Sequence, residues 1–149
     1  MKYEDGNRGV IQFRSRAKQI IDFSGLSFDY HITPTDIDGV IEYHALNCWA
    51  FMEFKCGNAP VPYGQKKAFE RLVDNCVYAG QDAILLICRH DTKNTNNDIN
   101  AADAIVSDLY WRGKWQENVG HSCRYVLDRY FRSRQHANNR EIERRVSTN

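Results

Sequence analysis

Three carboxylates and a lysine stand beside two apolar runs in residues 33–55, TPTDIDGVIEYHALNCWAFMEFK. Asp36 and Asp38 precede the first run, and Glu53 and Lys55 end the second. Because side chains alternate between the two faces of a strand, each pair shares one face. Carboxylate oxygens are the ligands that Mg²⁺ and Mn²⁺ prefer, and a lysine beside such an ion is suited to stabilise charge on a phosphate. The spacing therefore points to metal-assisted chemistry on a phosphate.

The spacing also predicts how the two runs pair. We expect strands over about 36–43 and 48–55, joined by a turn within 44–47, HALN. A two-residue turn at Ala45 and Leu46, or any even-numbered turn, brings the carboxylates to one surface. The opposed pairs are then Glu42 and Trp49, Val40 and Phe51, Asp38 and Glu53, and Asp36 and Lys55. Opposed carboxylates repel each other, and a divalent cation removes that cost. The alternative is a surface hairpin with mixed charges.

The other elements are predicted from hydrophobic periodicity and from turn residues. We expect a helix over 9–24, a short strand over 26–32, a helix over 63–79 that ends at Gly80, and a central strand over 83–88. A mobile loop at 91–100, a strand over 102–111, a short return from Trp115 and a helix over about 123–131 follow, with a frayed polar tail from about Ser133. The order αβββαββα predicts a single α/β domain over residues 1–149, a mixed central sheet flanked by helices.

Composition limits the classes of protein that remain. The 149 residues are 42% hydrophobic and 12% aromatic, enough for a core, and their formal net charge is +1. This balance excludes a histone-like basic binder and an acidic disordered tail. We expect no membrane-spanning helix and no secretory signal. The 5 cysteines are scattered without a CxxC pair, which favours a reduced, cytoplasmic protein.

The charges are unevenly distributed along the chain. Residues 23–111 carry 6 basic and 12 acidic side chains, whereas residues 112–149 carry 9 basic and 4 acidic ones. An acidic centre beside basic flanks suits a metal-dependent enzyme that acts on a polyanion. Solvated charge on the surface of an ordinary domain is the alternative.

Three motifs, PTDIDGVIEY, FMEFK and PYGQKKAFERLV, give the chain a family resemblance over residues 32–73. Together they resemble the PD-(D/E)XK nuclease superfamily, and more narrowly its small phage-type and Holliday-junction-resolvase-like members. The resemblance implies a restriction-endonuclease-like core with the site at a notch in the sheet. It also implies that Asp38 and Glu53 bind the metal, that the Phe54 carbonyl is a further ligand, and that Lys55 is the catalytic lysine.

The sequence departs from that family at its Pro-Asp pair, which is here Pro34-Thr35-Asp36 with Asp38 two residues on. Asp36 and Asp38 share a face, so either could be the metal ligand. We favour Asp38 because it enters the apolar strand, which is the usual context. Asp36 then binds a second metal ion or supports the first.

Residues at the start of the predicted helix 63–79 are further candidates. Gln65, Phe69, Leu72 and Cys76 have helical spacing, so Gln65 points toward the sheet. The resemblance implies that such a glutamine binds a phosphate or a metal-bound water, whereas capping of the helix is the alternative. Gly64 allows a phosphate to approach the backbone, and Tyr63 can stack on a base. For phosphate contacts with DNA we expect Arg14, Arg16, Lys18 and Lys66.

These observations predict an Mg²⁺-dependent endodeoxyribonuclease, with Mn²⁺ as a substitute, that is structure-selective or weakly sequence-specific. The alternative is a non-catalytic module on the same fold that binds nucleic acid, or a protein in the manner of a phage counter-defence factor. Resolvases of this superfamily are dimers, so a homodimer through an exposed edge strand at 102–111 is a further expectation.

Overall fold

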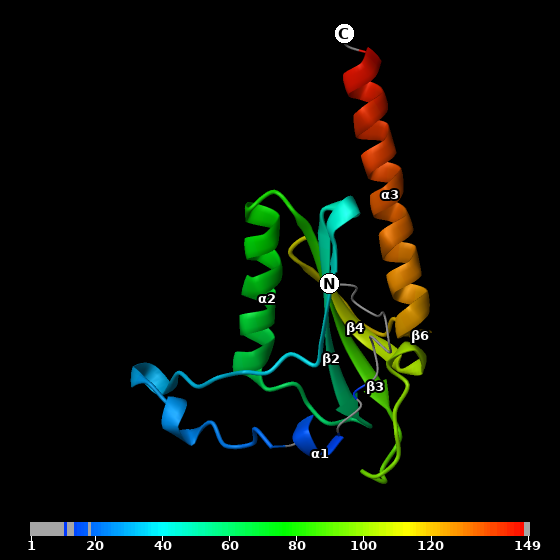
Figure 1. Ribbon diagram of the computed structural model, residues 1–149. Coiled ribbons are helices and arrows are strands. Elements are labelled where there is room, and N and C mark those ends of the chain that lie inside the picture. Colours follow the sequence, from blue (N-terminus) through cyan, green and yellow to red (C-terminus); the bar gives the residue numbers. More distant parts are fainter. Residues whose placement is uncertain (1–10, 12–13, 18, 148–149) are drawn as a thin grey trace, which may run out of the picture. The chain divides into compact units, whose positions relative to one another are not determined.

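A six-stranded mixed sheet with a helix on each face dominates the computed structural model, which describes residues 11, 14–17 and 19–147 (Figure 1). The chain divides into two compact units, residues 1–36 and 37–149. Within the described residues, no helix is long and apolar enough to cross a membrane. The structure therefore agrees with the mixed α/β class, and the single domain over 1–149 stays a prediction.

Short helices are the regular structure in the described part of the first unit. They are α1 Arg14–Ala17 and the 3₁₀ helices η1 Ser24–Leu26 and η2 Asp29–His31, with one isolated bridge between Phe28 and Ile32. Among the described residues, the predicted helix over 9–24 is α-helical only at Arg14–Ala17, and the predicted strand over 26–32 is wrong because two short 3₁₀ helices stand there. Ile20 and Ile21 are 77% and 81% exposed, so their spacing forms no buried face. Residues 9, 10, 12, 13 and 18 lie outside the described part.

The second unit contains the sheet and its two covering helices. Its elements are β1 Gly39–Tyr43, η3 His44–Leu46, β2 Cys48–Cys56, α2 Tyr63–Tyr78, β3 Asp82–His90, η4 Ala101–Asp103, β4 Ile105–Trp111, β5 Lys114–Gln116, β6 His121–Ser122 and α3 Cys123–Ser147. The spatial order is β1-β2-β3-β4-β5, and β6 also pairs with β4. β2 and β3 are parallel, with α2 as the crossover, and the other pairs are antiparallel.

The β1–β2 hairpin has the predicted register. Val40 lies opposite Phe51 and Glu42 opposite Trp49. The connection is four residues long, a 3₁₀ turn followed by Asn47 with φ of 52°. A loop of four residues leaves the same side chains on one face of the hairpin as a loop of two residues does. The predicted register is therefore unchanged, although the turn is longer than predicted. The predicted strand start near Asp36 is too early, because β1 begins at Gly39.

Two apolar layers hold the helices to the sheet. Phe51, Leu85 and Ile87 pack with Phe69 and Val73 of α2, and the other face of the sheet packs against α3. Residues 83–88 of β3 are all buried, as expected for a central strand covered on both faces.

α2 ends at the predicted glycine. Gly80 has φ of 88°, its N–H donates to the Val77 carbonyl, and the Gln81 N–H donates to the Cys76 carbonyl at 2.9 Å. This pair of hydrogen bonds is a Schellman motif, which satisfies the last carbonyls of the helix. The helix therefore stops where the sequence predicts.

Two predictions about the C-terminal third are wrong. β4 pairs with β3 on one side and with β5 and β6 on the other, so it is no edge strand, and the proposed dimer edge is absent there. The edges of the main path are β1 and β5. The predicted end of the last helix near 131 is too early, because α3 continues through the polar residues from Ser133 to Ser147. Its buried residues end at Tyr130, so the second half projects beyond the sheet (Figure 1).

Asp82 connects α3 to the start of β3. Its Oδ2 accepts hydrogen bonds from Tyr130 Oη and Trp111 Nε1, each at 3.0 Å. Arg134 Nε lies 3.7 Å from the same oxygen, and Arg112 Nε lies 3.7 Å from Oδ1. Burial and the Asp82 charge raise the pKa of Tyr130, so its hydroxyl keeps its proton. This network fixes the angle at which α3 leaves the sheet.

Candidate functional site

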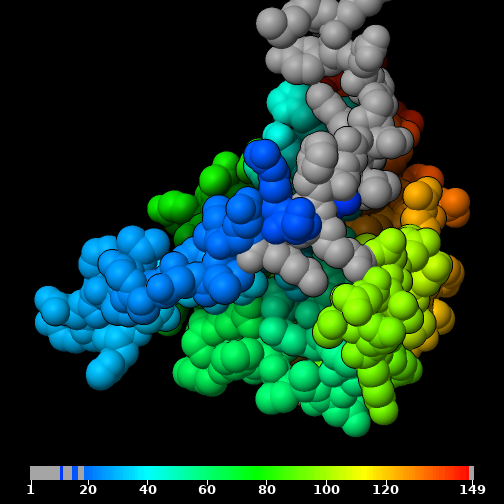
Figure 2. Space-filling view, turned by 60° about the horizontal axis from the view of Figure 1, so that its bottom comes forward, coloured from blue at the N-terminus to red at the C-terminus, as the bar shows by residue number. Residues whose placement is uncertain are grey.

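The start of β1, the end of β2 and the start of α2 lie at one end of the sheet in the second unit (Figure 1). α2 begins there because it must return the chain from the end of β2 to the start of the parallel strand β3. Figure 2 turns this end toward the viewer, with the segment after β2 in blue-green and the loop after β3 in yellow-green. Glu53 and Lys55 belong to β2, Gln65 belongs to α2, and Asp38 directly precedes β1.

The Asp38 side chain takes the place of a further backbone hydrogen bond between β1 and β2. β1 begins at Gly39, so β2 has no strand partner on that side beyond Met52. Asp38 Oδ2 accepts the Phe54 N–H at 2.8 Å instead. In a strand, the N–H and C=O of one residue face the same neighbour, so the Phe54 carbonyl faces the same open edge. This contact brings Asp38 beside the end of β2.

Glu53, Lys55 and Gln65 form a closed triangle of contacts. Lys55 Nζ lies 2.7 Å from Glu53 Oε1, and Gln65 Nε2 donates to the same oxygen at 3.0 Å. Lys55 Nζ also donates to Gln65 Oε1 at 3.4 Å. Gln65 is buried and turns toward the sheet, as its helical spacing predicts.

Glu53 is buried with one oxygen unpaired. Its relative exposure is 2%, and Oε2 has no hydrogen-bond partner in the described part of the chain. Burial raises the pKa of Glu53, the nearby Asp38 charge raises it further, and the Lys55 and Gln65 hydrogen bonds oppose the shift. A buried carboxylate oxygen without a partner is costly, so its retention favours a ligand that supplies positive charge.

The donor set fits Mg²⁺ or Mn²⁺. Asp38, Glu53 and the Phe54 carbonyl provide oxygen ligands only, and Mg²⁺ is commonly held by one or two carboxylates with water completing its shell. No cluster of three or more His, Cys, Asp or Glu side chains suited to a metal occurs among the described residues. Water or phosphate oxygens would complete the coordination of such an ion.

The other predicted residues lie at different places. Tyr63 is 77% exposed at the start of α2, and a Cβ on Gly64 would meet nothing within 4 Å. Lys66 Nζ lies 4.2 Å from the centre of the Trp115 ring. The remaining predicted residues belong to the first unit: Arg14 and Arg16 in α1, Asp36 as its last residue, and Lys18 outside the described part.

Sequence reasoning missed a polar cluster on the neighbouring strands. Arg89 is the partner of Lys55 on β3, and Ser107 and Asp108 face it from β4. The Arg89 guanidinium donates to Ser107 Oγ and to the carbonyls of Gly57 and Ala59. The signal was an arginine at the end of an apolar strand, two residues after a buried isoleucine. Only the strand order shows that it lies beside Lys55.

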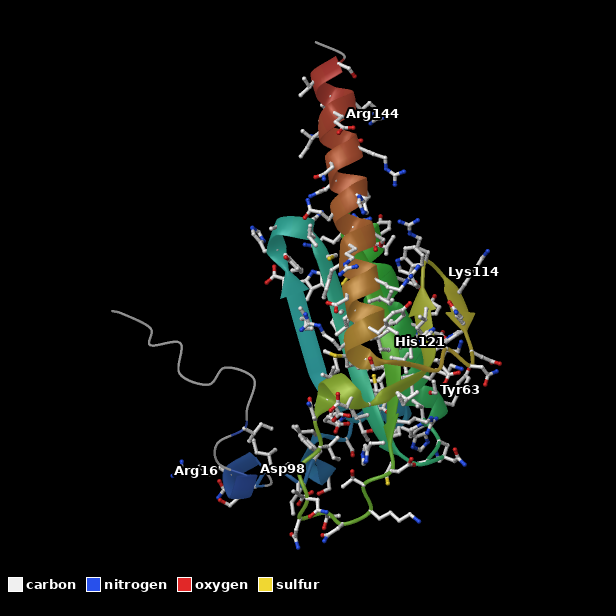
Figure 3. All side chains as sticks on the ribbon, turned by 90° about the vertical axis from the view of Figure 1, so that its right-hand side faces the viewer. Arg16, Tyr63, Asp98, Lys114, His121 and Arg144 are labelled. Carbon is white, nitrogen blue, oxygen red and sulfur yellow. The ribbon has the colours of Figure 1, made fainter. Side chains whose placement is uncertain are left out.

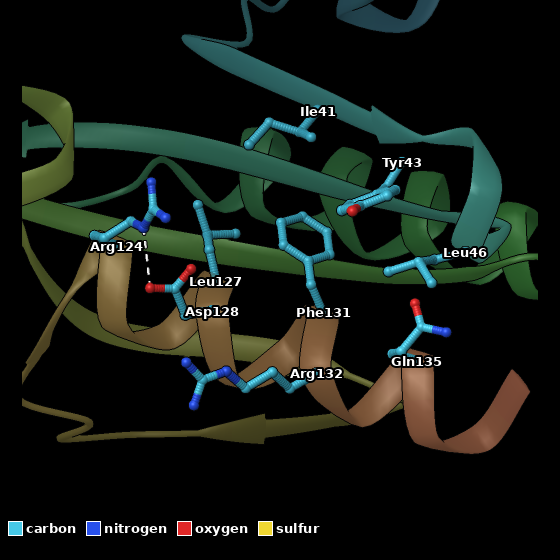
Figure 4. A pocket seen from close by; sticks show the side chains of 9 residues that line it. All are labelled: Ile41, Tyr43, Leu46, Arg124, Leu127, Asp128, Phe131, Arg132 and Gln135. Carbon is cyan, nitrogen blue, oxygen red and sulfur yellow. Dashed lines mark hydrogen bonds and ion pairs between the residues drawn. The ribbon is translucent and has the colours of Figure 1, made fainter. Parts of the chain in front are cut away.

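A groove lies on the other face of the sheet, between β1 and α3 (Figure 4). It has a volume of about 450 Å³ and an apolar floor that includes Ile41, Leu127 and Phe131. The only carboxylate that lines it, Asp128, is paired with Arg124 at 2.9 Å. The groove thus shares no residue with the carboxylate site.

Comparison of the chain with protein-family models, with curated proteins and with solved structures finds no match.

Proposed function

We propose that the protein is a metal-dependent nuclease that hydrolyses phosphodiester bonds in DNA, as its resemblance to the PD-(D/E)XK superfamily implies. The observation that carries the proposal is the unpaired, buried Glu53 Oε2 in a site that also holds Asp38 and the positive charge of Lys55. Burial and the Asp38 charge raise the pKa of Glu53, and a divalent cation stabilises a carboxylate in such a place.

Each residue has a distinct part in this proposal. Asp38, Glu53 and the Phe54 carbonyl would hold Mg²⁺, which supplies Lewis-acid stabilisation of phosphate charge. Lys55, held 2.7 Å from Glu53, carries its ammonium beside the reacting phosphate, where it orients water and offsets developing negative charge. Gln65 holds both side chains in place and keeps Glu53 oriented. Lys66 and the exposed start of α2 are suited to contact the phosphates of the DNA backbone.

The test compares two aspartates that are two residues apart. Asp38→Asn should abolish Mn²⁺ binding in calorimetry and Mg²⁺-dependent cleavage of supercoiled, linear, single-stranded and branched DNA, because it removes a charged ligand. Asp36→Asn should leave measurable cleavage. EDTA should stop the wild type, and Ca²⁺ should support DNA binding better than cleavage.

Three results would count against the proposal or its assignment of the metal ligand. Full activity in EDTA would exclude metal dependence. Loss of activity in Asp36→Asn with retention in Asp38→Asn would move the metal ligand to the first unit. DNA binding that persists without cleavage under every metal condition would favour the non-catalytic binding module.

A further inference from the structure

A second cavity lies beside the carboxylate site on the same face of the sheet. It has a volume of about 160 Å³ and is lined by Val61, Lys66, Ile87, Arg89, Asp108 and Trp115. Ile87 and Arg89 on β3 are the register partners of Glu53 and Lys55 on β2. Neighbouring strands are about 4.8 Å apart, so the cavity begins within one nucleotide's length of the proposed metal site.

The walls of this cavity are apolar and aromatic, and its end is polar. Val61, Ile87 and Trp115 provide flat apolar surface, and Trp115 is fixed by a 2.7 Å hydrogen bond from its Nε1 to Glu70 and by its contact with Tyr110. A volume of this size is below the roughly 300 Å³ of pockets for drug-sized ligands, and it suits one flat ring system.

The polar end is lined by a donor, Arg89, and an acceptor, Asp108. Arg89 is held by three oxygens through Nε and Nη1, and its Nη2 has no partner in the described part of the chain. Asp108 Oδ2 accepts the Ser107 hydroxyl at 2.6 Å, whereas Oδ1 has no partner among the described residues. Both side chains are half-buried, so hydrogen bonds from a ligand to them are stronger than the same hydrogen bonds in water.

We propose that this cavity binds one unstacked nucleobase of the DNA, next to the bond that is cut. Each base carries an N–H or amino donor beside an oxygen or ring-nitrogen acceptor, which matches free Asp108 Oδ1 and free Arg89 Nη2. Its ring would stack on Trp115, as bases do on aromatic side chains in single-strand binders. The ligand class rests on the proposed function, whereas the shape and polarity of the cavity do not.

A phosphate is a poorer occupant than a base. Arg89 and Lys66 would attract it, but the Asp108 carboxylate faces the same space and repels it. Lys66 now lies over the Trp115 ring, where the base would stack. Entry of a base would displace the Lys66 ammonium from the Trp115 ring. The ammonium could then pair with the phosphate next to that base.

The test uses isolated deoxynucleosides without any divalent cation, so that its outcome is independent of metal binding and cleavage. Each of the four deoxynucleosides, and 2-deoxyribose 5-phosphate as the base-free arm, is titrated into the ¹⁵N-labelled protein. The indole N–H resonance of Trp115, assigned with Trp115→Phe, should shift selectively over those of Trp49 and Trp111 for at least one deoxynucleoside. The sugar phosphate should cause no such shift.

Asp108→Asn should weaken deoxynucleoside binding about fivefold or more, because it loses a charged acceptor. Asp128→Asn on α3 is the matched control and should bind as the wild type does. Absence of a selective shift with every deoxynucleoside would overturn the proposal, as would an equal shift with the sugar phosphate. Equal affinities of Asp108→Asn and the control would remove Asp108 from the site.

Discussion

The chemistry proposed here depends on one buried carboxylate whose two oxygens differ in their hydrogen-bond partners. Glu53 Oε1 accepts from both Lys55 and Gln65, whereas Oε2 has none in the described chain. Side-chain alternation predicts that Asp38 and Glu53 share a face, because it needs only the period of the strand. The unpaired oxygen could not be predicted, because it depends on how α2 and β1 close around the site.

The raised pKa of Glu53 predicts a pH-dependent stability difference. Its ordinary value is 4.5, and the fold favours the protonated form. The stability from this group is therefore greatest below that value and is lost as pH rises. Glu53→Gln cannot ionise, so its Tm relative to the wild type should rise between pH 4 and pH 8 in metal-free buffer. Calorimetry checks this, and a difference that is constant with pH would contradict it.

Lys55 and Lys67 are a matched pair of lysines with different expected roles. Lys55→Ala should keep Mn²⁺ and DNA binding while cleavage falls by about two to four orders of magnitude, because the lysine acts on water and phosphate. Lys67 pairs with Glu70 on α2, so Lys67→Ala should leave the cleavage rate within a few fold of the wild type. A folded Lys55→Ala that cuts as fast as Lys67→Ala would leave the binding module as the better interpretation.

At the scale of elements, the predictions hold where two independent signals agree and the apolar side chains are buried. The hairpin combines alternation with an even-numbered loop, and α2 combines helical spacing with a glycine at its end. The predicted helix at 9–24 also has helical spacing and a Ser24-Gly25 end, but Ile11 and Ile20 are exposed, so its apolar residues gain no burial that would stabilise a long helix. The second half of α3 has no apolar face in the described structure, so periodicity gives no signal for it.

Alanine at Gly80 and alanine at Gly64 should change the stability of the protein in opposite directions. Gly80→Ala should cost about 1 kcal/mol of stability, because φ of 88° is unfavourable for a residue with a Cβ. Gly64→Ala should stabilise by about 0.5–1 kcal/mol, because it lies in the first turn of α2 with open space around its Cβ. Urea unfolding measures both values. If the two variants shift stability in the same direction, the Schellman motif is not what ends α2.

At the scale of the second unit, the site and the projecting half of α3 are separate. Tyr63, near the site, and Arg144, on the projecting helix, lie far apart (Figure 3). The buried residues of α3 end at Tyr130, and Asn138 Nδ2 donates a 3.3 Å hydrogen bond to the Ala45 carbonyl of η3. The core and the site therefore need only the first half of this helix.

This separation predicts that the end of α3 can be removed. A chain that stops after Asn139 loses Ile142 and Val146, which are 59% and 71% exposed, and loses no buried side chain of the described helix. Its free energy of unfolding should change by less than about 1 kcal/mol, and Mg²⁺-dependent cleavage should stay within a few fold of the full chain. In the full chain, amides after Asn139 should exchange with deuterium far faster than those of β3, because local opening there breaks no core contact. Slow exchange over residues 140–147, together with a large loss of stability on truncation, would mean that this half of α3 is covered in solution.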